Sequence, residues 1–150
     1  MKLPIPIAFA TLLAFAQAAP SGPGESRLEA RASVNDCGDS TFINQSSGGS
    51  PLVADCQHLA RNIAGGGTWR VTATGGQHQL AQYGTCAFGI QGHKDMDTAH
   101  VGNQDIIDLI NSSIAKFNWN GKVGAKGDML CQGEKGLMGK PKMTWGIYHT

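Results

Sequence analysis

The longest helical pattern in the chain lies between Val101 and Phe117. Hydrophobic positions recur there every three or four residues, as they do on one face of an α-helix. The inward face comprises Ile106, Ile107, Ile110, Ser113, Ile114 and Phe117, and the polar face comprises Gln104, Asp105, Asp108, Ser112 and Lys116. This stretch is predicted to be an amphipathic helix that covers another layer of the fold.

A shorter helix is predicted between Ser50 and Ile63. Ser50 suits an N-cap and Pro51 suits the first turn of a helix. The inward stripe comprises Leu52, Val53, Cys56, Leu59, Ala60 and Ile63, and the polar face comprises Asp55, His58, Arg61 and Asn62. Gly65–Gly67 ends the helix and is interpreted as a turn, because it lacks the Lys-Ser or Lys-Thr ending of a phosphate-binding loop.

Strands are predicted where hydrophobic and polar positions alternate. Residues 68–74 alternate in this way and, after a turn at Gly75–Gly76, Gln79–Ile90 is expected to pair with them as a hairpin. In a third strand, Val123, Ala125, Met129 and Cys131 alternate against Lys122, Lys126, Asp128 and Leu130. In a last strand, expected at a sheet edge, Met143, Trp145 and Ile147 alternate against Thr144, Gly146 and Tyr148.

These elements predict the α+β class. We expect a two-layer sandwich, in which an antiparallel β-sheet is covered on one face by the two α-helices. The long helix and the strand that ends at Cys131 would then pack against each other.

The first 31 residues are expected to precede the folded domain. Residues 1–18 combine one charge at Lys2, a short apolar run and small residues at Ala16 and Ala18, which is the layout of a secretory signal peptide. Residues 19–31 consist mostly of small, polar, Pro and Gly residues and are interpreted either as a disordered pro-segment cut after Arg31 or as an uncut tail. Residues 32–150 are expected to form a single domain.

The chain has four cysteines, which in a small secreted domain favour two disulfides. The absence of a C-x-x-C pair disfavours structural zinc and thioredoxin-like chemistry. Cys56 and Cys86 both point inward in the predicted elements, so a nested pairing of Cys56 with Cys86 and Cys37 with Cys131 is preferred. Cys131 also faces inward, and the pattern therefore leaves the two other connectivities open.

Charge narrows the range of partners. Acidic and basic residues after position 31 are equal in number, which disfavours a nucleic-acid binder that works by bulk charge. Both predicted helices carry mixed charge, and no later stretch is apolar enough to span a bilayer, so we expect no stable membrane insertion. We also expect a monomer without a cofactor.

One segment concentrates residues with catalytic chemistry. Between Gln91 and His100 the chain places His93, Lys94, Asp95, Asp97 and His100. Such residues can bind a metal or act as a base. The run is polar throughout and offers no nucleophile with an oriented base, so an exposed loop is the favoured interpretation and a hydrolase ranks last.

Two Asn-X-Ser sequences, at Asn44 and Asn111, are N-glycosylation acceptors by sequence. Asn44 lies in a polar loop and is the better acceptor. Asn111 lies at the margin of the inward helical stripe, where we expect it to be more shielded.

The ordered set of motifs resembles one known family. The motifs are Cys37–Phe42 (CGDSTF), Ser50–Cys56 (SPLVADC), Gly65–Trp69 (GGGTW), Tyr83–Phe88 (YGTCAF), Val101–Asp108 (VGNQDIID) and Val123–Gly127 (VGAKG). In this order, and with all four cysteines, they resemble the fungal Ecp2-type effector family, also called the Hce2 or necrosis-inducing-factor domain. The resemblance implies a secreted fungal protein associated with virulence and necrosis in host plants, acting in the apoplast, and it supplies no catalytic residue.

The expected architecture is also similar to that of the KP4 killer toxins, by analogy. Those toxins contain more cysteines than this chain, so their channel-blocking activity is not carried over. The resemblance to the effector family implies a non-enzymatic effector that binds an extracellular or cell-surface host target, and the alternative is an antimicrobial KP4-like toxin directed at competing fungi or ion channels. As a hypothesis, the interaction surface lies on the sheet face away from the helices, where Arg70, Tyr83, Lys122 and Lys126 would project.

Overall fold

The computed structural model describes residues 33–72, 76–93, 98–134 and 139–150. The predicted signal peptide (1–18) and pro-segment (19–31) lie outside the described residues. The elements follow one another as β1 (Cys37–Ser40), β2 (Ile43–Asn44), α1 (Val53–Asn62), β3 (Thr68–Thr72), β4 (His78–Tyr83), β5 (Cys86–Gly92), β6 (Thr98–Gly102), α2 (Asn103–Phe117), β7 (Ala125–Gly133) and β8 (Lys142–His149).

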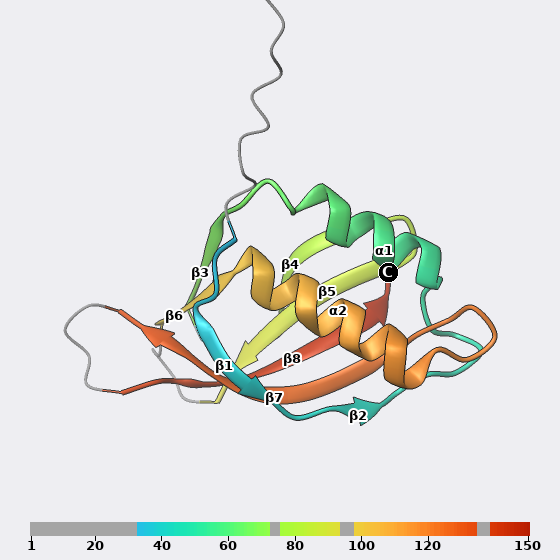
Figure 1. The fold of residues 1–150 in the computed structure, drawn as a ribbon. Helices are drawn as coiled ribbons and strands as arrows, with labels where there is room; N and C mark the ends of the chain where they lie inside the picture. The colour runs from blue at the N-terminus through green and yellow to red at the C-terminus, as the bar shows by residue number, and fades with distance from the viewer. Residues whose placement is uncertain (1–32, 73–75, 94–97, 135–138) are drawn as a thin grey trace, which may run out of the picture.

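The α+β class is confirmed, with two helices on one side of an eight-stranded sheet (Figure 1). The main strand order is β3-β6-β7-β8-β5-β4, and neighbouring strands in this order pair antiparallel. Figure 1 shows the strands curving below the helices, with β3 and β6 at one side. The sheet therefore curves toward a barrel and departs from the flat layers of a simple two-layer sandwich.

Strand β7 is the centre of this sheet because both of its edges are occupied. Its residues 125–130 pair with β8 along one edge. Along the other edge β2, β1 and β6 follow one another in turn. The β1–β2 connection crosses so close to β7 that a Cβ on Gly127 would lie 1.8 Å from the carbonyl oxygen of Thr41. Glycine is therefore required at this position.

The predicted first hairpin is wrong. Strand β3 pairs with β6 instead of with the segment that follows it, and Arg70 lies opposite His100. The predicted second strand, Gln79–Ile90, is itself a hairpin of β4 and β5 in which Tyr83 pairs with Cys86. The chain reverses at Gly84, whose φ is 53°, a conformation that glycine adopts without a steric penalty. Because alternation continues through this turn, the sequence pattern did not reveal it.

The prediction of an edge position for the last strand is also wrong. Strand β8 lies between β7 and β5 and pairs with both over most of its length. Its inward residues Met143, Trp145 and Ile147 are buried, as the alternation predicted. The Trp145 indole donates a hydrogen bond to Ser40 Oγ at 2.6 Å, and Phe42 packs edge-on against the same ring. The core thus includes the N-terminal strands as well as the sheet and helices.

Both predicted helices are present, with corrections at their N-terminal ends. Helix α1 is preceded by Leu52 as N-cap, which is 44% exposed, and no side chain caps it. Ser50 is buried and its hydroxyl donates to the Gln45 carbonyl, so it stabilises a loop and does not cap the helix. In α2, Ile106 and Ile110 are fully buried as predicted, but Asp105, assigned to the polar face, is only 8% exposed.

The two disulfides connect Cys37 with Cys131 and Cys56 with Cys86, which is the preferred nested pairing. Cys37 and Cys131 are opposite residues on the neighbouring strands β1 and β7. The other bond joins α1 to β5. Each helix–sheet contact region therefore has one covalent link close to it.

Candidate functional site

Two concave regions of the described structure lie beside strands of the sheet and contain polar side chains. The first has a volume of about 300 Å³, lies between β1 and α2 beside the Cys37–Cys131 bond, and includes the carboxylates of Asp39, Asp105 and Asp108. The second has a volume of about 370 Å³ and lies over the start of β7 and the end of β8.

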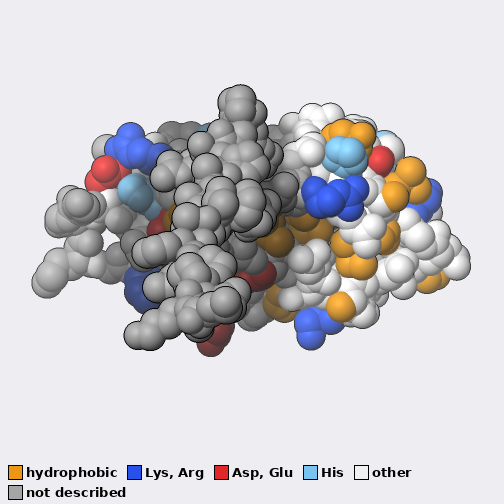
Figure 2. All heavy atoms as spheres, turned by 45° about the horizontal axis from the view of Figure 1, so that its top comes forward, with side chains coloured by type: hydrophobic (Ala, Val, Ile, Leu, Met, Phe, Trp, Pro, Cys, Tyr) orange, Lys and Arg blue, Asp and Glu red, His pale blue; other side chains and the backbone are white. Residues whose placement is uncertain are grey.

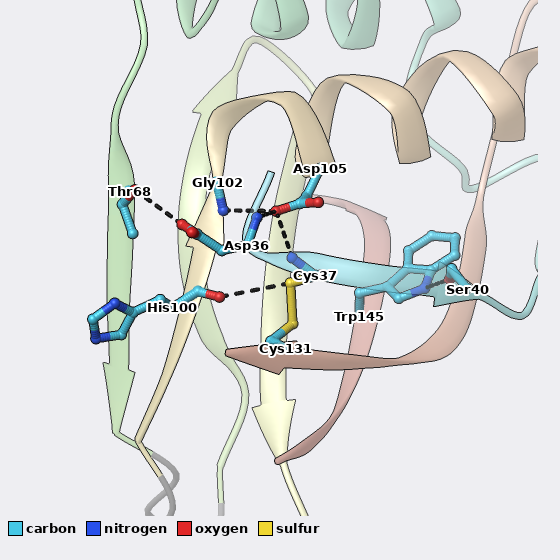
Figure 3. Close-up of a disulfide and its surroundings, with 9 residues drawn as sticks. All are labelled: Asp36, Cys37, Ser40, Thr68, His100, Gly102, Asp105, Cys131 and Trp145. Atoms are coloured by element: carbon cyan, nitrogen blue, oxygen red, sulfur yellow. Dashed lines mark hydrogen bonds between the residues drawn. A yellow bond between two sulfur atoms is a disulfide. The ribbon is translucent and has the colours of Figure 1, made fainter. Parts of the chain in front are cut away.

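In the first region, backbone N–H groups bind one carboxylate oxygen of Asp105 (Figure 3). Its Oδ2 accepts hydrogen bonds from the N–H groups of Asp36 at 2.7 Å, Gly102 at 2.8 Å and Cys37 at 3.2 Å. Burial raises the pKa of the Asp105 carboxyl, and the three N–H donors oppose that shift. This carboxylate fixes β1 against the start of α2, and we therefore assign it a structural role.

The second region is a groove on the outer side of the sheet, and we call it the outer groove. One wall is the loop between β2 and α1, the floor is β7 with β8, and the other wall carries side chains from the β4 and β8 ends. Its polar lining comprises Gln45, Ser47, Ser50, Gln77, Lys126, Tyr148 and His149. None of the described residues that line it is acidic.

The loop wall of the outer groove is held by its own side chains. The Ser50 hydroxyl accepts from the Ser47 N–H at 2.9 Å and donates to the Gln45 carbonyl at 3.2 Å. The Gln45 N–H in turn donates to the Gly124 carbonyl at 2.8 Å, which attaches the loop to the sheet. This wall is therefore formed before any ligand arrives.

The opposite wall consists of Tyr148 and Gln77 above glycine residues of β5 and β8. A Cβ on Gly89 would lie 2.9 Å from the Tyr148 hydroxyl, and a Cβ on Gly146 would lie 3.2 Å from Gln77 Nε2. The missing side chains therefore let the ring and the amide lie close to the backbone. Burial raises the pKa of the Tyr148 hydroxyl, so this group stays neutral at physiological pH.

A polar cluster farther along the same strands contains His93, from the predicted His/Asp loop. His93 Nε2 lies 2.6 Å from Thr144 Oγ1, and that hydroxyl donates to Asp128 at 2.6 Å. Lys142 pairs with Asp128 at 3.0 Å. The Thr144 hydrogen bond, followed by Lys142 and His93, lowers the pKa of Asp128. His100 lies in β6 and not in a loop, and Lys94, Asp95 and Asp97 lie outside the described residues.

The structure does not bring the four hypothesised interaction residues together. Arg70 pairs with Glu134 at 2.8 Å, and Tyr83 stacks on His58 of α1 with 3.8 Å between ring centroids. Lys122 Nζ donates to the Gly48 carbonyl. Lys126 is the member of the set that lines the outer groove. Tyr83 therefore contacts the helix layer, whereas Lys126 belongs to the outer side of the sheet.

The helix side offers a different surface. Figure 2 shows basic, histidine and hydrophobic side chains interspersed there, in the part that the grey atoms leave visible. A third concave region lies between α1 and α2 and includes Arg61 and Asn111. Both glycosylation acceptors, Asn44 and Asn111, are exposed, so the expected shielding of Asn111 is not seen. No helix within the described ranges is both long and apolar enough to cross a membrane.

Most of the outer groove is not predicted by the sequence pattern. The alternation of β8 did place Gly146 and Tyr148 opposite Trp145, and that was the available signal. Gln77 and the Gln45–Ser50 loop come from other parts of the chain, and only the folded sheet brings them beside Tyr148.

The fold and these surfaces define a small, disulfide-linked α+β domain, and comparison with known proteins identifies its family. The sequence model of the Hce2 family, described as a pathogen effector and putative necrosis-inducing factor, matches residues 36–131. The chain belongs to this family.

Two relatives from Penicillium expansum are also similar in sequence. "Probable chitinase LysM18" is 42% identical over 118 residues, which cover 77% of this chain and 8% of the relative. "Secreted chitinase LysM12" is 33% identical over 114 residues, which cover 73% of this chain and 7% of the relative. The chain thus spans less than a tenth of the length of these curated relatives.

Proposed function

We propose that this chain is a secreted fungal effector that acts in the host apoplast by binding an extracellular or cell-surface target, without catalysis. The observation that carries the proposal is the match of the Hce2 effector family to residues 36–131, which include both disulfides and most of the sheet. Two disulfides suit a protein that works in an oxidising, extracellular environment.

The arrangement of the polar side chains favours binding over chemistry. Asp105 is committed to three backbone N–H groups. The Thr144 hydroxyl, which lies beside His93, donates its proton to Asp128 at an exposed site and so lacks the buried, oriented base of an activated nucleophile. The four cysteines are all in disulfides. These groups have structural partners, and the outer groove offers a polar concavity for a ligand.

The names of the two relatives favour a carbohydrate as the target. Both are named chitinases, and this chain corresponds to a small part of each. A module of this size joined to an enzyme that acts on a polysaccharide is well placed to bind a polysaccharide itself. We therefore favour a cell-wall polysaccharide over a protein receptor as the target of this chain.

Infiltration of the purified, folded protein into leaves tests the effector role. We expect local cell death, measured as ion leakage, and expect it to disappear after reduction and alkylation of the disulfides. A Lys122→Glu/Lys126→Glu variant reports on the outer side of the sheet, and Arg61→Glu on α1 is its matched control. Absence of a response to the folded protein across several host species would contradict the proposal.

A second candidate function is an antimicrobial, KP4-like toxin directed at competing fungi. The chitinase names of the relatives favour it, because chitin is a polymer of fungal walls. Growth assays on other fungi distinguish the two functions. Inhibition of fungal growth without any response in leaves would replace the first proposal by the second.

A further inference from the structure

We propose that the outer groove is the binding site for a neutral polysaccharide chain, with the Tyr148 ring as the stacking surface and Gln77 and Lys126 as hydrogen-bonding groups. The inference rests on the proposed function, because it names the ligand class and the site for the same extracellular target.

The lining of the outer groove matches the chemistry of sugar hydroxyls. A sugar hydroxyl both donates and accepts hydrogen bonds, and the groove offers groups of both kinds. The amides of Gln45 and Gln77 and the hydroxyls of Ser47 and Tyr148 can each do both. The Lys126 side chain adds an exposed donor. A set of mixed donors and acceptors of this kind orients a polyol.

The glycine floor of the outer groove positions the Gln77 amide beside the Tyr148 ring. Gly146 lies at its centre, paired with Lys126 of β7 on one side and Gly89 of β5 on the other. The nearest atom to a Cβ at Gly146 would be Gln77 Nε2, at 3.2 Å. Gly146 therefore lets the Gln77 amide lie close to the backbone, beside Tyr148.

Tyr148 supplies the aromatic component. Its hydroxyl lies 3.4 Å from Gln79 Oε1, and its ring lies over Gly89, so its position is fixed from two sides. The ring is partly exposed. A tyrosine held in this way offers an apolar face for the C–H groups of a sugar ring and a polar edge for its hydroxyls.

Charge favours a neutral chain over an anionic one. A polyanion needs several cations in a row, whereas the described lining of the outer groove contains one lysine, Lys126, and one histidine, His149. No described carboxylate lines the groove to repel or pair with a ligand. Because the loop wall is already ordered, little conformational entropy is lost on binding.

Calorimetric titration of the full secreted protein tests the site. The probes are β-linked hexasaccharides of glucose and of N-acetylglucosamine, with a hexamer of galacturonate as the anionic arm. We expect one site for at least one neutral hexamer, with an affinity that changes little with salt. Tyr148→Ala should weaken that binding about tenfold, whereas Tyr148→Phe should retain most of it.

Tyr83→Ala is the matched control, because Tyr83 is an exposed tyrosine that stacks on α1, away from the outer groove. It should bind like the parent protein. Gly146→Ala is the second variant. Its methyl group would lie 3.2 Å from Gln77 Nε2, so it should displace this amide and weaken binding even if Tyr148→Ala does not fold.

Binding of neither neutral hexamer, preference for the galacturonate hexamer, or equal losses in Tyr148→Ala and Tyr83→Ala would each overturn the inference. The leaf assay separates this failure from failure of the proposed function. A leaf response that Tyr148→Ala leaves intact rejects only the sugar site, whereas absence of both sugar binding and a leaf response rejects both.

Discussion

Asp55 and Asp105 hold equivalent positions in the two helices, but their surroundings differ. Each lies in the first turn of its helix and accepts a backbone N–H next to a disulfide. Asp55 Oδ2 accepts from the Thr85 N–H at 2.8 Å and from its hydroxyl at 2.7 Å, beside Cys86. Asp105 Oδ2 accepts from three N–H groups, one of them that of Cys37.

The two aspartates differ in their exposure to solvent and in the direction of their pKa shifts. The Thr85 hydrogen bonds lower the pKa of Asp55, whereas burial raises the pKa of Asp105. Water can replace Asp55 as a partner of Thr85 at low cost. Asp105 is 8% exposed and its bond from the Gly102 N–H is buried, so the loss of this acceptor is costly. An aspartate in the first turn of a helix therefore contributes little to stability at α1 and much more at α2.

The largest effect is expected from removal of the disulfide on the Asp105 side. Cys37→Ala/Cys131→Ala opens a link with a sequence separation of 94, against 30 for Cys56–Cys86. The chain-entropy relation gives losses of about 4.7 kcal/mol and about 3.6 kcal/mol respectively. Urea unfolding of the two double variants measures the difference. A larger loss in Cys56→Ala/Cys86→Ala would reverse the ranking of the two regions.

The next effect is that of Asp105→Ala. It leaves three backbone N–H groups without their acceptor, and we expect a loss of about 3 kcal/mol in the free energy of unfolding. Asp108→Ala, on the exposed side of the same helix, is the matched control and should change little. Equal unfolding midpoints for the two variants would show that water replaces Asp105 as the acceptor for the three N–H groups, and would contradict this prediction.

A smaller effect is expected at the Asp55 side. Thr85→Val removes the hydroxyl that donates to Asp55 and accepts the Leu52 N–H at 2.9 Å, and retains the Thr85 N–H bond. The expected loss is about 1 kcal/mol, measured by urea unfolding against Thr72→Val on the exposed side of β3. A loss as large as that of Asp105→Ala would remove the contrast between the two aspartates.

The smallest effect is a difference in pH dependence. Because the pKa of Asp55 is lowered on folding, its contribution to stability is present above its unfolded pKa of about 3.9 and is lost as the pH falls through the lower folded value. The pKa of Asp105 is raised, so protonation just above about pH 3.9 favours the folded state.

Unfolding midpoints measured between about pH 3 and pH 6 check these signs. Asp55→Asn should flatten the loss of stability at the acid end. Asp105→Asn should remove the gain in stability that protonation of Asp105 gives just above about pH 3.9. The net loss of stability on acidification should therefore become steeper. Identical pH profiles for the two variants would contradict the opposite shifts.

The sequence predicted those parts of the fold in which hydrophobic residues recur with the period of a strand or a helix. The inward residues of β7 and β8 and the inward isoleucines of α2 follow from alternation or helical spacing. The same patterns favoured the observed cysteine pairs but left the two other connectivities open. The burial of Asp105 was not predicted, because its position beside Gln104 looks polar until β1, distant in the chain, covers it. The pairing of β3 with β6, the central place of β8 and the outer groove depend on similarly distant contacts, which periodicity does not encode.

The two occupied edges of β7 also set an order of events during synthesis. Residues 125–133 emerge well after β1 and β2, yet they are the pairing partners of these two strands among the described residues. Cys37 must therefore wait as a free thiol while Cys56 and Cys86 emerge and pair. Until Cys131 arrives, Cys37 is available for wrong exchange with either of them, so rapid closure of Cys56–Cys86 favours correct maturation of the domain.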